Sequence, residues 1–371
     1  MRCRLHRFAL TKAVPLAISR GTTSQVEHLL LEIAHDGLTG RGESGGLDTG
    51  HRRYATGAIA AELEGLLPVL EGLDPDPLQA LTPLLEPLSP PARCAVDLAL
   101  LDWHGKRLGQ PLQRLWGLDQ QRAVATSVTL GLGSVEAVRQ RLERWWEQLP
   151  ATRIKLKLGS PEGLQHDRAL LEAVSDTLET RQQQLGLGLE LQVDANGGWD
   201  ADGVRAMAPL LAERRVVLLE QPLPAREDPE ADCAAFASLE FDCPIPLVAD
   251  ESCWNLADLV RLAPYVDGVN IKLLKSGGLS EALLMALAAR RLGLEVMVGC
   301  YSDSALLNGA AAQLLPLVRW PDLDSHLNLV DDPFEAPPLE GDRLRAGPGP
   351  GLGVSLRHDA WHHSAAGGCG C

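Results

Sequence analysis

The sequence lacks several features that would place it in common classes of protein. No apolar run reaches the about 20 residues that a membrane span requires. The eight cysteines show no Cys-x-x-Cys spacing, which favours reduced thiols over a disulfide framework or a zinc site. The N-terminal stretch is basic, but Lys12 interrupts its apolar part before a secretory core can form. We therefore expect a cytoplasmic protein.

Basic residues are also scarce relative to acidic ones. Lysine and arginine total 34 and aspartate and glutamate total 49, so the formal net charge is -15. A chain this acidic repels phosphate backbones and anionic lipid surfaces, and we expect neither a nucleic-acid nor a membrane partner. The 371 residues, 45% of them hydrophobic, suffice for two domains or for one barrel with an added domain.

Lysine is the scarcest charged residue, because only six of the 34 basic residues are lysine. A lysine amine can lose its proton in a protein, whereas an arginine guanidinium stays charged. Four of the six lysines fall in two clusters that end predicted buried strands: Lys155, Lys157, Lys272 and Lys275. Chance survival of surface lysines is the alternative, but the position of the clusters favours chemistry that needs a neutral amine.

The chain divides by the period of its hydrophobic pattern. Residues 1–122 alternate and then become helical, which predicts an α+β unit. From 123 to 330, short apolar runs alternate with amphipathic stretches, and seven or eight such βα units predict a parallel barrel. We expect residues 331–360 to return to the N-terminal unit and 361–371 to be a disordered tail. The expected strands and helices of the two units are 2–9, 26–35, 52–72 and 92–107, then the barrel strands 126–130, 153–158, 189–194, 216–220, 246–250, 267–272 and 294–299.

Three carboxylates end successive predicted barrel strands: Asp194, Glu220 and Asp250. The carboxyl ends of barrel strands converge on one mouth, where active sites lie. Three like charges cannot remain together without a counter-ion, and an oxygen-only ligand set favours Mg²⁺ over zinc. Three separate salt bridges are the alternative interpretation.

Two lysines are predicted to flank these carboxylates. Lys157 ends the strand before the first carboxylate, and Lys272 ends the strand after the last. A cation and a second ammonium, from Lys155 and Lys275, would lower the pKa of each flanking amine toward the range of a general base. Two opposed amines suit removal of a proton from one face of a carbon and its return to the other, through an enediolate.

The motifs Lys-x-Lys, Asp-Ala-Asn, Glu-Gln-Pro, Asp-Glu-Ser and Asn-Ile-Lys-x-x-Lys-x-Gly-Gly occur in this order within residues 2–357. Because it contains this set of motifs in this order, the chain resembles the muconate-lactonising subgroup of the enolase superfamily. The resemblance implies a modified TIM barrel, (β/α)7β, with an α+β N-terminal capping domain. It also implies Mg²⁺ at the three carboxylates and an acid/base role for Lys157 and Lys272.

A further pair, Asp322 and Asp324, lies near the last predicted strand. An Asp-x-Asp pair can hold a substrate ammonium, although a solvated loop is the alternative. The pair is similar to that of dipeptide epimerases, which implies an isomerase that inverts the α-carbon of the C-terminal residue of an L-Ala-Xaa type dipeptide. That resemblance implies that Asp322 and Asp324 bind the substrate. We expect Lys155 and Lys275 to contact the substrate as well.

Two cues on the second residue of the dipeptide disagree. Arg20 lies where some Ala-Glu epimerases place an arginine for a side-chain carboxylate, but it would equally suit a capping-loop salt bridge. Asp303 would instead favour a cationic or polar side chain.

The alternative functions are an o-succinylbenzoate synthase or cycloisomerase, an N-acylamino acid racemase, a Schiff-base aldolase and a non-catalytic binding protein. A homo-oligomer is compatible with the sequence, which does not set the oligomeric state.

Overall fold

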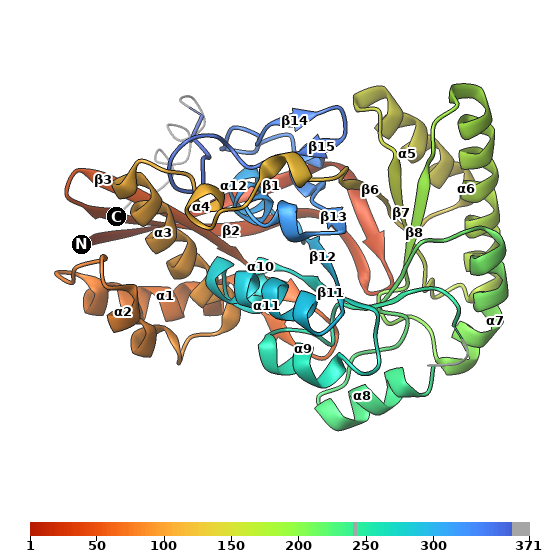
Figure 1. The fold of residues 1–371 in the computed structure, drawn as a ribbon, viewed down its shortest axis with the longest axis horizontal. Coiled ribbons are helices and arrows are strands. Elements are labelled where there is room, and N and C mark those ends of the chain that lie inside the picture. Colours follow the sequence, from red (N-terminus) through yellow and green to blue (C-terminus); the bar gives the residue numbers. More distant parts are fainter. Residues whose placement is uncertain (240–242, 358–371) are drawn as a thin grey trace, which may run out of the picture.

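The computed structural model describes residues 1–239 and 243–357. Its N-terminal part is an antiparallel sheet covered by helices, on the left in Figure 1. The apolar residues of one face of the second strand, among them Leu29 and Leu31, pack against the helices, whereas Leu30 packs with the barrel. Gly40 and Gly42 let the third strand approach α3, because a Cβ at either position would meet a helix carbonyl oxygen. The elements are β1 (Arg2–Ile18), β2 (Gly21–His35), β3 (Leu38–Gly45), β4 (Leu47–Asp48), β5 (Arg53–Tyr54), α1 (Thr56–Leu70), α2 (Leu78–Leu85), α3 (Pro90–Leu108), α4 (Leu112–Leu115) and the 3₁₀ turn η1 (Gln120–Arg122).

The second part is a sheet of eight parallel strands in the order β13-β12-β11-β10-β9-β8-β7-β6. The two edge strands meet, since the Ser127 hydroxyl on β6 donates to Asp322 on β13 at 2.7 Å, and the sheet forms a nearly closed barrel. The expected barrel is therefore confirmed. Its strands are β6 (Ser127–Leu130), β7 (Arg153–Lys157), β8 (Glu190–Asp194), β9 (Leu219–Glu220), β10 (Leu247–Ala249), β11 (Gly268–Ile271), β12 (Glu295–Gly299) and β13 (Trp320–Asp322).

Helices alternate with these strands and cover the outside of the barrel (Figure 1). Their apolar faces pack on the strands in two large clusters, with Trp145 and Phe236 among the fully buried side chains. No helix within residues 1–239 and 243–357 combines the length and the apolar character needed to cross a bilayer. The helical elements are α5 (Val135–Gln148), α6 (Leu164–Leu185), α7 (Ala201–Glu213), α8 (Pro229–Ala237), α9 (Leu256–Leu262), α10 (Leu273–Ser276), α11 (Leu279–Arg291), α12 (Ala305–Ala312), η2 (Leu315–Leu317) and η3 (Ser325–Asn328).

The segment after the barrel runs back along the N-terminal part. It contains the short hairpin β14 (Leu339–Glu340) and β15 (Arg343–Leu344). Gly351 exchanges backbone hydrogen bonds with Gln110 and Leu112, and the Leu352 amide donates to Asp102 of α3. The expected disordered tail, 361–371, lies outside the described residues.

Four expected element limits were wrong by more than two residues. Strand β2 begins at Gly21 rather than at residue 26. Strand β1 extends to Ile18 rather than to residue 9, because its pairing with β2 resumes at Leu16 after an irregularity. The helix expected from 52 begins at Thr56, since residues 53–54 pair with 47–48 in a small hairpin. Strand β9 contains only Leu219–Glu220 of the expected 216–220.

Candidate active site

The parallel register brings the predicted residues to one mouth of the barrel. Lys157 lies opposite Asp194 on the neighbouring strand, and Asp194 lies opposite Glu220. Asp250 directly follows β10, which pairs with β9. Because neighbouring strands are about 4.8 Å apart, residues in register at the strand ends are within reach of one another. The strand-end pattern in the sequence thus becomes a single cluster.

Asp194, Glu220 and Asp250 form a buried carboxylate triad. Each is at most 1% exposed, and one oxygen of each lies within 4.8 Å of the others. Burial and the charge of Asp194 raise the pKa of Glu220 to about 8. Three carboxylates grouped in this way offer only oxygen donors, which fits a hard divalent cation such as Mg²⁺.

Two pairs of lysines contact the triad. Lys157 donates to Asp194, with Nζ 2.5 Å from Oδ2, and Lys272 donates to Asp250, with Nζ 2.6 Å from Oδ2. The second lysine of each pair also contacts the triad. Lys155 donates to Glu220 at 3.1 Å, and Lys275 donates to the other oxygen of Asp250 at 2.5 Å. All four side chains are buried.

The expected lowering of the lysine pKa depends on a bound cation and stays a prediction. Burial lowers the pKa of Lys272, but the negative charges around it, led by that of Asp250, together outweigh burial and raise this pKa well above the usual range. The sequence argument counted a cation and the neighbouring ammonium groups, and it omitted the carboxylate that contacts Lys272. Lys157 and Lys272 nevertheless line one cavity, of about 460 Å³, between the barrel mouth and the N-terminal loops.

The two aspartates of the Asp-x-Asp pair differ in their contacts. Asp322 accepts hydrogen bonds from Lys155 and from the Ser127 hydroxyl, one on each oxygen. Asp324 accepts one from the Thr129 amide at 2.7 Å and also lines a second, smaller cavity. Burial and the charge of Asp322 raise the pKa of Asp324. Asp324 therefore has more capacity left for a ligand than Asp322.

Arg20 reaches the barrel mouth from the loop between β1 and β2, and its guanidinium is already hydrogen-bonded to other residues of the protein. Its guanidinium donates to Glu251 at 2.9 Å and to the Asn196 carbonyl at 3.0 Å. The side chain of Glu251 is only 3% exposed, so this ion pair is largely shielded from water on one side. The capping-loop salt bridge, one of the two alternatives for Arg20, thus exists in the structure.

Sequence reasoning missed two residues of the site. Glu251 directly follows a predicted carboxylate ligand, and its Oε2 is buried without a hydrogen-bond partner in the described part of the chain. Tyr301 lies with its ring centroid 4.6 Å from the Lys272 amine and lines the main cavity. The adjacency of Glu251 to Asp250 is a signal that was available in the sequence. Asp303 is buried, but it does not line the main cavity.

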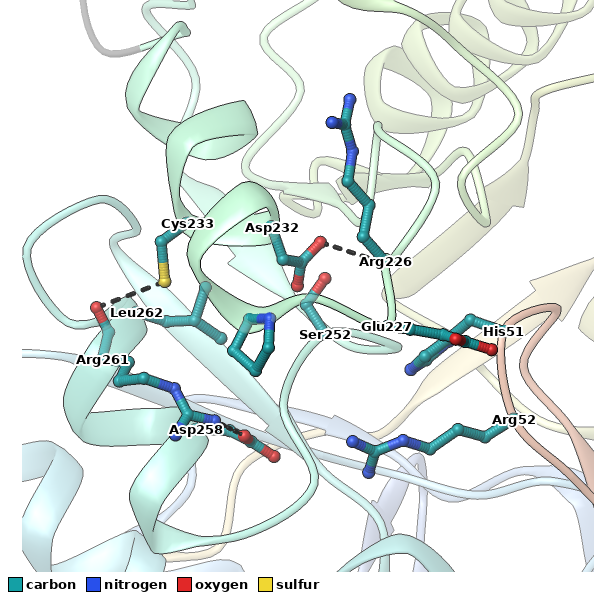
Figure 2. Close-up of a pocket in the computed structure, with 11 residues that line it drawn as sticks. His51, Arg52, Arg226, Glu227, Asp232, Cys233, Ser252, Asp258, Arg261 and Leu262 are labelled. Carbon is teal, nitrogen blue, oxygen red and sulfur yellow. Dashed lines mark hydrogen bonds and ion pairs between the residues drawn. The ribbon is translucent and has the colours of Figure 1, made fainter.

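A loop of the N-terminal part closes one side of the mouth. Figure 2 shows Arg52 of this loop extending toward Asp258 of the barrel, while His51 lies with Glu227. Arg52 lies 4.9 Å from the ring centroid of Trp254, whose indole donates to the Glu251 carbonyl at 2.7 Å. The cavity at this contact is about 10 Å³, room for roughly one water molecule, so it is a packed contact rather than a substrate site.

Comparison with known proteins gives a consistent result. The model of the mandelate racemase/muconate lactonizing enzyme N-terminal domain matches residues 4–117, and that of the enolase C-terminal domain-like family matches 137–360. The hydrophobic dipeptide epimerase of Flavobacteria bacterium (strain MS024-2A) is 35% identical over 363 residues, which cover 97% of this chain and 99% of that protein. The protein of the same description from Roseobacter litoralis is 36% identical over 363 residues, covering 96% of this chain and all of that protein.

A solved structure is similar over the same extent. The dipeptide epimerase from Methylococcus capsulatus, complexed with Mg and the dipeptide L-Arg-D-Lys, has a TM-score of 0.83 and 30% sequence identity. The match covers 95% of this chain and 99% of that chain. Both parts of the fold are therefore shared with that protein.

Proposed function

We propose a function from the premise that this chain belongs to the mandelate racemase/muconate lactonizing enzyme family of the enolase superfamily. The protein is an Mg²⁺-dependent dipeptide epimerase that inverts the α-carbon of the C-terminal residue of its substrate. One observation carries this proposal. Lys157 and Lys272, four strands apart around the barrel, contact the two ends of one carboxylate triad and line the same cavity.

The triad would hold the Mg²⁺ through Asp194, Glu220 and Asp250, which bring together the oxygen donors that this cation prefers. When bound, the cation supplies positive charge that stabilises an enediolate. The binding of Mg by the Methylococcus capsulatus protein supports this assignment.

The two lysines would carry the proton. The neutral amine of one removes the α-proton, and the electron pair of the C–H bond moves into the neighbouring carboxylate to form the enediolate. The ammonium of the other lysine then returns a proton to the opposite face of the carbon, which inverts it. Lys155 opposes protonation of Lys272 through its own charge. Each turnover leaves the two lysines in exchanged protonation states, ready for the reverse reaction.

Asp324 would bind the free α-ammonium of the dipeptide. Removing one partner of such a charge pair costs about 2–5 kcal/mol, so Asp324→Asn should lose about 30-fold or more in kcat/KM. N-acetylation of the substrate deletes the same charge from the other side. N-acetylation should lower kcat/KM of the unmodified enzyme by a similar factor. It should lower kcat/KM of Asp324→Asn little further, because the mutation and the acetyl group remove the same contact. Steady-state kinetics on free and N-acetylated substrate measure this non-additivity.

Equal turnover of N-acetylated and free dipeptides would contradict this assignment and favour an N-acylamino acid racemase. The metal and lysine assignments would stand, because they depend on other residues.

The second residue of the substrate is proposed to be apolar. Arg20, which would otherwise face a side-chain carboxylate, is paired with Glu251. The main cavity is also lined by apolar side chains of the N-terminal part, among them Ile18, Val26 and Leu47. The two bacterial relatives are named hydrophobic dipeptide epimerases, which supports an apolar second residue in this substrate as well.

An enzyme that prefers an apolar second residue should have a kcat/KM for L-Ala-L-Leu about tenfold or more above that for L-Ala-L-Glu. The reason is that the glutamate carboxylate would be buried without a free partner. Glu251→Gln removes the charge that holds Arg20 and should shift the ratio toward L-Ala-L-Glu. Competition between the two dipeptides in one reaction, followed by mass spectrometry, measures the ratio. A preference for L-Ala-L-Glu in the unmodified enzyme would show that Arg20 leaves Glu251 for the substrate.

We also propose a cytoplasmic location. The six cysteines within the described residues are free, which suits a reducing compartment. Thiol titration of protein purified from its native cell under non-reducing conditions should therefore find these groups unoxidised.

A further inference from the structure

Lys12 is a buried lysine that the reaction does not use. It is 7% exposed, and among the described residues it forms no ion pair within 4.0 Å. It lies where β1 leaves β2, since the pairing of these strands is interrupted between Thr11 and Leu16 and Lys12 bridges to Leu329 instead. The interruption turns this part of β1 toward the barrel mouth.

The Lys12 side chain lines a cavity of about 50 Å³ together with Asp324 and Arg141. Leu16 and Tyr301 form walls of both this cavity and the main one, so the two are adjacent. One water-sized group needs roughly 10–15 Å³ of such volume. The smaller cavity therefore has room for about four heavy atoms, as many as an aspartate side chain has.

The position of Asp324 connects this cavity to the substrate. If the α-ammonium of the dipeptide lies on Asp324, the side chain of the N-terminal residue starts one bond away and enters the adjacent space. The bound ammonium would neutralise Asp324 and leave two cations, Lys12 and Arg141, on the wall of the cavity. Asp303 also acts on the charge of Lys12 but does not line this cavity. The occupied site would thus carry an excess positive charge.

Lys12 is the better donor of the two cations. Arg141 is held in place, because its guanidinium lies 4.1 Å from the ring centroid of Trp145 and donates to Asn328 at 3.0 Å. Among the described residues no such contact is found for the Lys12 ammonium, and burying most of a charged side chain without a partner is costly. A carboxylate in the cavity would provide that partner.

We propose that Lys12 determines specificity for the first residue of the substrate, by binding a short acidic side chain such as that of an N-terminal aspartate. This inference rests on the proposed epimerase function and concerns a side chain different from the one that is inverted. It assigns a role to the one buried lysine outside the Lys-x-Lys and Lys-x-x-Lys clusters.

Three substrates test the proposal: L-Asp-L-Leu, L-Asn-L-Leu and L-Ala-L-Leu. Aspartate and asparagine have the same shape, so their kcat/KM ratio isolates the charge. We expect a ratio of about ten or more in the unmodified enzyme, since the charge-assisted hydrogen bond is absent with asparagine. Lys12→Met should bring the ratio to one or below, while Arg7→Met, which removes an exposed charge from the same strand, should leave it unchanged.

The outcomes separate the inference from the proposed function. If none of the three dipeptides is epimerised and other dipeptides are also inert, the epimerase function fails. If L-Asn-L-Leu is used as well as L-Asp-L-Leu by the unmodified enzyme, the inference on Lys12 is overturned and the epimerase function stands. An equal loss on all three substrates in Lys12→Met would also overturn it, because that pattern indicates a structural role. Should Lys12→Met fail to fold, the ratio in the unmodified enzyme decides alone.

Discussion

Changing either Lys157 or Lys272 to arginine is expected to lower epimerisation about a thousandfold, while one isomer still exchanges its α-proton with solvent. Arginine keeps the positive charge but stays protonated, so the variant has only one usable base. Epimerisation requires both lysines, whereas exchange requires only the lysine that faces the proton. Lys157→Arg should therefore exchange one isomer in D₂O, and Lys272→Arg should exchange the other.

The matched control is Lys106→Arg. Lys106 is partly buried and paired with Asp102 at 2.6 Å in the N-terminal part, so this variant makes the same chemical change away from the reacting atoms. Proton NMR of both isomers in D₂O follows exchange and inversion in one sample. Normal epimerisation by both site variants would rule out the two-base mechanism.

Loss of the metal site is the second large effect that we expect. Asp194→Asn keeps the size of the side chain but removes one of three charges that would hold Mg²⁺, and turnover should fall about a hundredfold or more. Isothermal titration with Mg²⁺ should show weaker binding by the same variant, which is a readout independent of activity. Circular dichroism should show an unchanged fold, and the melting temperature should fall, because Asp194→Asn leaves the buried Lys157 amine without its charged partner.

Asp176→Asn is the control for this change, since Asp176 forms an exposed ion pair with Arg214 on the outside of the barrel. It should leave both Mg²⁺ binding and turnover unchanged. Treatment of the unmodified enzyme with EDTA should remove activity, and added Mg²⁺ should restore it. Full activity in a chelated sample would contradict the role of the metal.

The sequence predicted the parts of the site that depend on strand ends. A parallel strand with both faces buried reads as a short apolar run, and a charged residue directly after it must lie at the barrel mouth. That rule predicts that the strand-end residues Asp194, Glu220, Asp250, Lys157 and Lys272 lie together. The parallel register of β7, β8 and β9 then brings Lys157, Asp194 and Glu220 side by side.

The rest depends on contacts between distant segments, which no local pattern encodes. The pairing of Arg20 with Glu251 joins residues 231 apart in the chain, and Lys155 reaches Asp322 across 167 residues. The irregularity of β1 that turns Lys12 toward the mouth also depends on its bridge to Leu329. Such contacts decide which carboxylates are free for a ligand, and therefore substrate preference.

The central claim is that this chain epimerises dipeptides at the α-carbon of their C-terminal residue. Incubation of a dipeptide library with the protein and Mg²⁺ in D₂O, followed by mass spectrometry and chiral separation, tests it most directly. We predict that L-Ala-L-Leu and related dipeptides gain one deuterium at that α-carbon and yield the L,D isomer, and that dipeptides in a chelated control gain none. A library in which no dipeptide gains deuterium or changes configuration would contradict the claim.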